Sequence, residues 1–221
     1  MDYIKLMKER HSVRNYLDKP IEKEKVDLLK EEIEKINSES GMRFQLFTDE
    51  PKAFNGNETK YGKFTNCKNY FALVGRKGRD EEIGYYGEKL VLFAQGLGLN
   101  TCWVALTYRK GQVVIDKEED EKLYVVISLG YGANQGVEHI GKDVPDVCNM
   151  KRDFPDWFRT GVEGALTAPT AINQQKFYFT YLGDSNVKAD YGLGFYAKMD
   201  LGIAKLHFEL AVGDEVEVIW K

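Results

Sequence analysis

The spacing of hydrophobic and polar positions predicts four helices along the chain. Over residues 22–36, apolar residues recur at the spacing of one helix face, which is typical of an amphipathic helix. Residues 81–98 are apolar on most sides of the helical projection, so we expect a buried central helix there. Two further helices are expected over residues 156–166 and 199–212.

Short apolar or alternating runs, bounded by turn residues, lie between these helices and predict strands. The expected strands cover residues 43–48, 68–75, 101–106, 122–132, 176–182 and 215–220. Residues 133–156 are polar and contain turn-forming glycine and proline. We therefore expect an irregular crossing segment there.

The order of these segments contains a weak internal repeat. RFQLFTDE, after the first amphipathic helix, resembles KFYFTYLGD after a later helix. GEKLVLFAQGLG likewise resembles GIAKLHFELAVG, which sets Gly87 opposite Gly202. Two such passes suggest two pseudo-symmetric halves, residues 1–150 and 151–221, joined in one compact unit.

Composition and charge narrow the class of protein. The net charge is -4, so there is no basic excess to neutralise nucleic-acid phosphates or an anionic membrane. The three cysteines are too scattered for a disulfide framework or a metal site. A charged N-terminus and the lack of a long apolar run lead us to expect a cytoplasmic protein without nucleic-acid or membrane partners.

The first candidate site is the segment RHSVR near the N-terminus. Arg10, Ser12 and Arg14 alternate, so an extended backbone would direct all three side chains to one side. Two guanidiniums and a hydroxyl at one point suit a phosphate, which arginine binds in a bidentate manner. The alternative is a solvated basic terminus that makes surface ion pairs.

The second candidate is the polar stretch 169–175, which lies between a helix and a strand. The side-chain amides of Asn173, Gln174 and Gln175 both donate and accept hydrogen bonds, so they suit the edge of a heterocycle. The alternative is an ordinary turn whose amides cap nearby backbone groups.

The third candidate is the glycine-rich end of the central helix and the strand that follows it, within residues 87–110. Glycines there could allow the backbone to approach a flat ligand closely. Gly-Leu-Gly is also an ordinary helix terminator, and the pattern alone fits both interpretations.

Together these stretches resemble one known family. RHSVRNYLDKPI is similar to the R-x-S-x-R-x-F opening of the FMN-dependent nitroreductase superfamily, and GEKLVLFAQGLGLNTCWV resembles its central helix and next strand. ISLGYG is similar to its following strand, and APTAINQQKF resembles its A-P-S-x-x-N-x-Q-P-W loop. The resemblance spans the chain and implies a nitroreductase-like α+β fold around a mixed, mainly antiparallel sheet.

The order of the motifs departs from ordinary members of that superfamily. Those members are homodimers that combine R-x-S-x-R from one subunit with the P-S-x-x-N loop of the other. Here the arginine motif occurs only in the first half and the loop only in the second. The resemblance therefore implies the single-chain, pseudo-dimeric branch, with a monomer that binds one FMN.

The same resemblance implies roles for individual residues. Those expected to bind the cofactor are Arg10, His11, Ser12, Arg14, Val104, Ala105, Leu106, Lys142, Pro169, Thr170, Asn173 and Gln175. The arginine motif would bind the phosphate and ribityl chain, with Lys142 as a further cation. The backbone of 104–106 would pass the flavin N5, and the loop 169–175 would border the ring. No side chain is expected to act as a nucleophile or general base, and for Glu88 we expect a place on the helix surface or a buried hydrogen bond rather than the role of a catalytic acid.

The implied activity is electron transfer from NADH or NADPH to nitroaromatic, quinone or similar flat acceptors by a ping-pong mechanism. One alternative is a non-redox FMN-binding or scavenging protein, because Ala105 and Leu106 replace the usual glycines. Another is a different flavin chemistry on the same scaffold, such as a dehalogenase-like or flavin-fragmenting activity.

Overall fold

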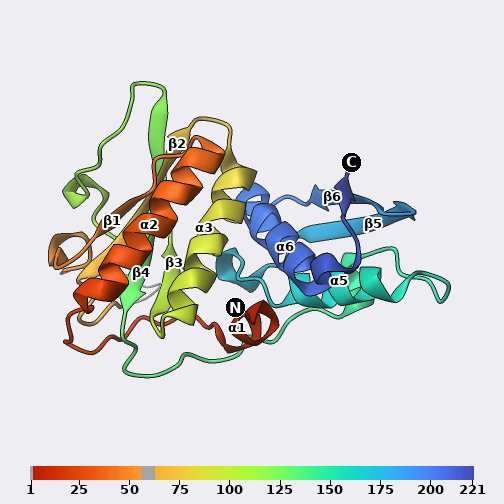
Figure 1. Cartoon of the computed structure of the whole chain (residues 1–221), viewed down its shortest axis with the longest axis horizontal. Helices are drawn as coiled ribbons and strands as arrows, with labels where there is room; N and C mark the ends of the chain where they lie inside the picture. The colour runs from red at the N-terminus through yellow and green to blue at the C-terminus, as the bar shows by residue number, and fades with distance from the viewer. Residues whose placement is uncertain (1, 56–62) are drawn as a thin grey trace. The chain divides into compact units, whose positions relative to one another are not determined.

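The computed structural model describes residues 2–55 and 63–221 (Figure 1). The fold is α+β, as predicted, and all four expected helices are present. Contacts group the chain into two units, which are described separately. Unit 1 comprises residues 1–9, 80–89 and 139–221, and unit 2 comprises residues 10–79 and 90–138. This grouping cuts across the predicted halves 1–150 and 151–221, which stay a prediction about the internal repeat.

Unit 2 is built on a four-stranded antiparallel sheet with strand order β1-β2-β4-β3. Its strands are β1 (Gln45–Phe47), β2 (Asn69–Arg76), β3 (Asn100–Val104) and β4 (Glu121–Gly130). The two central strands, β2 and β4, are buried along almost their whole length. This burial explains why they appear in the sequence as continuous apolar runs rather than as alternating ones.

Helix α2 (Lys23–Ser40), labelled in Figure 1, is amphipathic. Leu29, Ile33 and Ile36 on its apolar face are buried. It extends past the predicted end at residue 36. Gly41 ends it in the left-handed conformation, with φ 67°, which glycine adopts without steric cost. The short 3-10 helices of this unit are η1 (Pro51–Ala53) and η2 (Lys110–Gln112).

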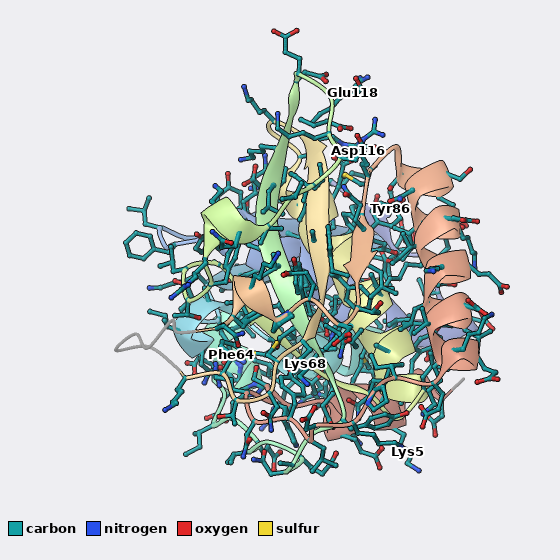
Figure 2. All side chains as sticks on the ribbon, turned by 90° about the vertical axis from the view of Figure 1, so that its left-hand side faces the viewer. Lys5, Phe64, Lys68, Tyr86, Asp116 and Glu118 are labelled. Carbon is teal, nitrogen blue, oxygen red and sulfur yellow. The ribbon has the colours of Figure 1, made fainter. Side chains whose placement is uncertain are left out.

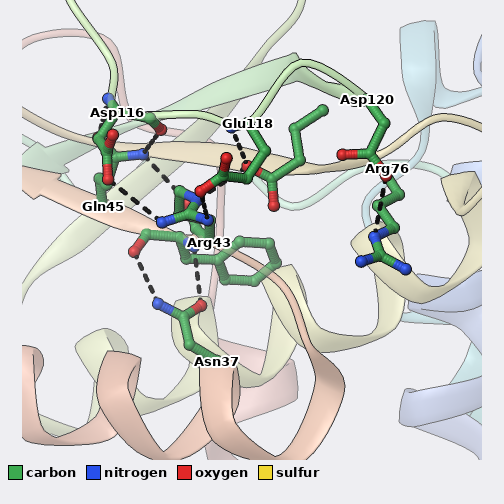
Figure 3. Close-up of polar contacts among 9 residues, drawn as sticks. Asn37, Arg43, Gln45, Arg76, Asp116, Glu118 and Asp120 are labelled. Carbon is green, nitrogen blue, oxygen red and sulfur yellow. Dashed lines mark hydrogen bonds and ion pairs between the residues drawn. The ribbon is translucent and has the colours of Figure 1, made fainter.

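Arg43 ties the entry of β1 to the loop before β4. Its Nε donates to Glu121 at 2.8 Å, and its other nitrogens pair with Glu118 at 2.9 Å and Asp116 at 3.2 Å (Figure 3). Figure 2 shows Asp116 and Glu118 close together at one end of the sheet. Burial acts to raise the pKa of Glu121, but hydrogen bonds from the Glu118 N–H and Arg43 outweigh it and leave that pKa below its ordinary value.

Unit 1 contains a second, smaller sheet with strand order β5-β6-β7. Its elements are α1 (Tyr3–Glu9), α4 (Val144–Val147), α5 (Asp156–Leu166), η3 (Ala171–Asn173), β5 (Phe177–Gly183), β6 (Asn186–Tyr191), α6 (Ala197–Val212), η4 (Gly213–Glu215) and β7 (Ile219–Trp220). The first ten residues of α3 (Asp80–Gly96) also belong to this unit. The single sheet expected from the resemblance is thus two sheets, of which only β6 and β7 pair in parallel.

Strand β6 was not predicted from the sequence. It forms a hairpin with β5, closed by a tight turn in which Gly183 and Asp184 have φ values of 102° and 48°. Gly183 pairs with Asn186 at the start of this turn, where glycine adopts a positive φ without steric cost. The missed signal was the Gly-Asp pair that follows the aromatic run.

Helices α3 and α6 approach each other closely enough to exclude side chains at two glycines. A Cβ added at Gly84 would lie 2.0 Å from the carbonyl oxygen of Met199, and one at Gly202 would lie 1.8 Å from that of Glu81. The contacts are reciprocal, since the same sequence offset relates Gly84 to Gly202 and Glu81 to Met199. This sets Gly84 opposite Gly202, about one helical turn from the pairing that the sequence repeat suggested.

Helix α6 packs against α5 in a similar way, through Gly161 beside Phe208 and Gly164 beside the backbone of His207. Phe208 also belongs to an aromatic cluster between these helices and the small sheet. The cluster comprises Phe154, Trp157, Phe158, Phe177, Phe179, Tyr181, Phe208 and Trp220. Helix α6 is therefore the central helix of unit 1, buried on most of its sides.

Among the described residues, no helix is both long enough and apolar enough to cross a membrane.

The helix crossing makes a stability prediction. Gly202→Ala places a methyl group against the Glu81 carbonyl, so we expect the free energy of unfolding to fall by about 2–3 kcal/mol through overpacking. Denaturant unfolding of the purified variant measures this change. Gly111→Ala is the matched control, because a Cβ at Gly111 meets nothing within 4 Å. Equal stability of the two variants would refute the close crossing.

Candidate functional site

The N-terminal segment that carries the predicted phosphate ligands is extended and lies beside β3 in unit 2. The Val13 N–H donates to Thr101 at 3.0 Å, and Ser12 pairs with Thr101 as a parallel bridge. Further along, the Leu17 N–H donates to the carbonyl of Tyr131 at 2.8 Å. The backbone of this segment is thus fixed by strand-like pairing, as its alternating sequence requires.

The structure brings Arg10, Ser12 and Arg14 together around one buried thiol, that of Cys102. Burial raises the pKa of Cys102, while the charge of Arg14, a hydrogen bond with Ser12 and the charge of Arg10 all oppose that rise. Arg10 is buried at 4% exposure, whereas Arg14 is exposed. All three residues therefore act on the same thiol, and the Arg14 side chain is exposed to solvent.

His11 packs under the turn that follows β4. A Cβ added at Gly136, whose φ is 76°, would lie 2.6 Å from the Cβ of His11. Asn100 at the start of β3 holds this turn, because its Oδ1 accepts from the Gly132 N–H at 2.9 Å and its Nδ2 donates to Gln135 at 3.1 Å. The sequence analysis did not identify Asn100, which resembles an ordinary turn residue after Gly-Leu-Gly.

The residues predicted to pass the flavin N5 lie at the end of β3. Val104 is the last residue of that strand and is buried, Ala105 is half-buried in the bend that follows, and Leu106 is 74% exposed. The strand thus ends where the predicted contact would begin.

In unit 1 the predicted ring-bordering loop has an unusual backbone. Ile172, Asn173 and Gln175 all have positive φ, of 49°, 55° and 42°. This left-handed region is uncommon for residues other than glycine and is most unfavourable for a β-branched residue such as isoleucine. Strain of this kind persists only where surrounding contacts hold it.

Gln175 is the most buried residue of the loop, at 1% exposure. Its Oε1 accepts from the Lys142 N–H at 2.6 Å, and its Nε2 donates to the Leu166 carbonyl at 3.0 Å. Lys142 Nζ donates to the Gln175 carbonyl at 2.7 Å, and the Gln175 N–H donates to Thr170 Oγ1 at 3.1 Å. The predicted ligands Lys142, Thr170 and Gln175 therefore lie together, and they bind one another.

The other loop residues are more open. Asn173 is exposed, and its Nδ2 donates to the Ile140 carbonyl at 2.9 Å, which leaves its Oδ1 directed elsewhere. Pro169 is half-buried at the start of the loop. Asn173 is thus the predicted loop ligand whose side chain remains accessible to solvent.

The sequence analysis missed Asp200 of α6, which contacts this loop. Both of its carboxylate oxygens accept from the Ala171 N–H, at 3.1 and 3.2 Å, and Oδ2 also accepts from Gln174 Nε2 at 2.8 Å. Asp200 is only 4% exposed, and burial raises its pKa to about 6 despite the hydrogen bonds from Gln174 and Ala171. A single aspartate in an apolar helix gave no signal that it contacts a distant loop.

Glu88 has the buried role expected for it. Its Oε1 lies 3.1 Å from His207 Nε2, both side chains are fully buried, and His207 Nδ1 lies 2.8 Å from Thr167 Oγ1. Because Glu88 and His207 are completely buried, a substrate cannot reach them. The hydrogen bonds from Glu88 through His207 to Thr167 instead join α3, α6 and the end of α5.

Comparisons with known proteins agree with this fold. The family model described as "Putative TM nitroreductase" matches residues 2–212. A putative nitroreductase from Thermotoga maritima MSB8 is 21% identical, with a TM-score of 0.68 over 96% of this chain and 83% of that chain. No curated protein matches the chain.

Two shorter structures share part of the fold. A putative nitroreductase from Exiguobacterium sibiricum 255-15, solved in complex with FMN, is 16% identical, with a TM-score of 0.52 over 68% of this chain and 98% of that chain. A putative NADH dehydrogenase/NAD(P)H nitroreductase from Bacteroides thetaiotaomicron VPI-5482 is 21% identical, with a TM-score of 0.52 over 69% of this chain and 98% of that chain. Since the family model spans nearly the whole chain, the protein belongs to the putative TM nitroreductase family.

Proposed function

We propose that the protein is an FMN-dependent oxidoreductase that transfers electrons from NADH or NADPH to nitroaromatic, quinone or similar flat acceptors by a ping-pong mechanism. The observation that carries this proposal is the convergence of Arg10, Ser12 and Arg14 around Cys102 in a member of a nitroreductase family. One structure with the same fold is described as a complex with FMN.

The residues at the N-terminal segment fit the phosphate of FMN. Arg14 is exposed and carries a permanent positive charge, and Arg10 adds a second charge from a buried position. Ser12 supplies a hydroxyl beside them. Pairing of the backbone at Ser12 and Val13 with Thr101 fixes the main chain that carries these side chains, so less conformational entropy is lost on binding.

The loop 169–175 supports a role at the flavin ring, but its side-chain amides are proposed to have different roles. Asn173 is exposed and is the side chain we propose to contact the heterocycle. Gln175 is buried and engaged by Lys142 and Leu166, so its contribution is to hold the loop together. The same contact ties Lys142 to the loop.

The bound flavin supplies the redox chemistry, and the chain supplies binding and orientation. The described site presents no side chain that must act as a nucleophile. Hydrogen-bond donors around the flavin would favour the negative charge that accumulates on reduction. The proposed contribution of the chain is therefore electrostatic and positional, with one FMN bound by a monomer.

A non-redox FMN-binding protein is the second candidate, and Leu106 is the observation that favours it. An exposed leucine, 74% accessible, follows the end of β3, where the resemblance leads us to expect a glycine close to N5. Such a side chain would hinder a nicotinamide or acceptor without disturbing the phosphate contacts.

Flavin content and reduction decide between these candidates. We expect purified protein to contain or take up one FMN per monomer, measured by absorbance and by size-exclusion chromatography. Anaerobic NADH or NADPH should then bleach the oxidised flavin bands. Protein that binds FMN and is reduced by neither donor would support the non-redox candidate, and protein that takes up no FMN would refute both.

Arg14→Ala tests the phosphate contact. Loss of one charge-assisted contact is expected to weaken FMN binding by about 1.5–3 kcal/mol, or roughly tenfold or more. Titration with FMN followed by flavin fluorescence measures the change. Arg159→Ala is the control, because Arg159 is also exposed and pairs only loosely with Glu163 at 3.9 Å. Unchanged affinity for FMN would remove Arg14 from the site.

The two loop amides should respond differently to truncation. Gln175→Ala leaves the Lys142 N–H without its acceptor and takes one of two partners from the Leu166 carbonyl, so we expect it to lower the free energy of unfolding by about 1–3 kcal/mol. Asn173→Gly, which keeps the positive φ without steric cost, should change stability by less than about 1 kcal/mol while weakening FMN binding. Thermal unfolding and FMN titration of both variants separate the two roles, and the reverse pattern would contradict the assignment.

A further inference from the structure

We infer that Asp200 is a positioning residue of the proposed flavin site. Its buried carboxylate holds the loop 169–175 in a conformation with positive φ at Ile172, Asn173 and Gln175. This inference rests on the proposed function, because the loop is the segment assigned to the flavin ring. No motif points to Asp200, which lies on a different element from the loop that it contacts.

The contact between Asp200 and the loop is short and points at the middle of the loop. The Ala171 N–H donates to both carboxylate oxygens, and Gln174 Nε2 donates to Oδ2 at 2.8 Å. Ala171 and Gln174 lie on either side of Ile172 and Asn173, which have positive φ. A carboxylate bound on both sides of these residues fixes the backbone that carries the Asn173 side chain.

Asp200 itself is fixed in place. It lies in the first turn of α6, where the partial positive charge of the helix N-terminus favours a carboxylate. Its backbone N–H donates to the Tyr196 carbonyl at 2.9 Å. Two residues further on, Gly202 packs against the Glu81 carbonyl of α3, so this turn of α6 has no room to shift.

The hydrogen-bond pattern requires a carboxylate rather than an amide at this position. Gln174 Nε2 donates one hydrogen to Asp200 and the other to the Phe195 carbonyl at 2.7 Å. An asparagine at 200 whose oxygen takes the Oδ2 position would still accept from Ala171 and Gln174, but its NH₂ group would then face the Ala171 N–H at the Oδ1 position. Turning the Gln174 amide over would place its oxygen against the Phe195 carbonyl, so one contact is lost in every arrangement.

The protonation of Asp200 gives this role a pH signature. Burial raises its pKa from the ordinary 3.8 to about 6, and the two neighbours that oppose this rise, Gln174 and Ala171, do not titrate. Since the folded state holds the proton more tightly than the unfolded chain, stability falls as the pH rises between about 4 and about 6. Above that range the ionised carboxylate binds the loop, but its burial lowers the free energy of unfolding. Below that range the protonated carboxyl group offers the loop one acceptor fewer.

Asp200→Asn tests the inference, with Asp214→Asn as the control, because Asp214 is exposed beyond the other end of α6. In protein without flavin, we expect amide exchange at Ala171 to be about tenfold faster in Asp200→Asn, because a charge-assisted acceptor is replaced. We expect FMN binding at about pH 7.5 to weaken by a similar factor. The melting temperature at this pH should not fall, because the variant removes a buried charge.

The pH dependence separates positioning from a general structural role. Between about pH 7.5 and pH 5, FMN affinity should fall in the wild type and in Asp214→Asn more steeply than in Asp200→Asn. The phosphate of FMN also titrates near this range, but it is the same in all three experiments. Only the difference in slope therefore reports on Asp200.

Several results would overturn the inference. These are equal exchange at Ala171, equal FMN affinity, or equal slopes with pH for Asp200→Asn and the wild type. If Asp200→Asn does not fold, Gln174→Met removes the amide side of the contact, and unchanged FMN affinity in that variant would have the same meaning. A wild type that takes up no FMN would refute the proposed function, while exchange at Ala171 would still decide whether Asp200 holds the loop.

Discussion

The close crossing of α3 and α6 is the constraint on which unit 1 depends. Two glycines let each helix backbone reach the other, and the reciprocal contacts of Gly84 and Gly202 leave no freedom to slide. The crossing fixes the first turns of α6, and Asp200 lies in these turns. Helix packing in the interior therefore determines where the Asp200 carboxylate lies. That carboxylate in turn holds the loop in a backbone conformation that is unfavourable by itself.

The loop and its contact with Asp200 show how a folded protein can retain locally unfavourable backbone conformations and buried charges. A left-handed isoleucine and a buried carboxylate with a raised pKa each cost free energy. They meet where Asp200 of α6 binds the loop, which Gln174, Gln175 and Lys142 also help to hold. Such concentrations of strain are typical of binding sites, where geometry matters more than stability.

Periodicity alone predicted much of the fold. The apolar faces of α2 and α5 and the continuous apolar runs of β2 and β4 are strong signals, because burial forces them on the sequence. Strand β6 was missed because NVKADY is polar on its open face and its partner is set by a turn. The single expected sheet became two because strand pairing between distant segments leaves no local trace.

The candidate site was predictable where a motif lies within one continuous stretch. Arg10, Ser12 and Arg14 are brought together by simple alternation along an extended backbone. Asp200 and Asn100 could not be found in that way, since each acts on a segment far away in sequence. Gln175 was placed in the correct loop, but its burial follows from packing that its neighbours in sequence do not specify.

The reciprocal glycines have a consequence for how this family can vary. A side chain at either glycine would push the helices apart and move Asp200 away from the loop, whatever the loop sequence. Across related chains, the geometry of the loop 169–175 should therefore be inherited through the glycines of the two helices.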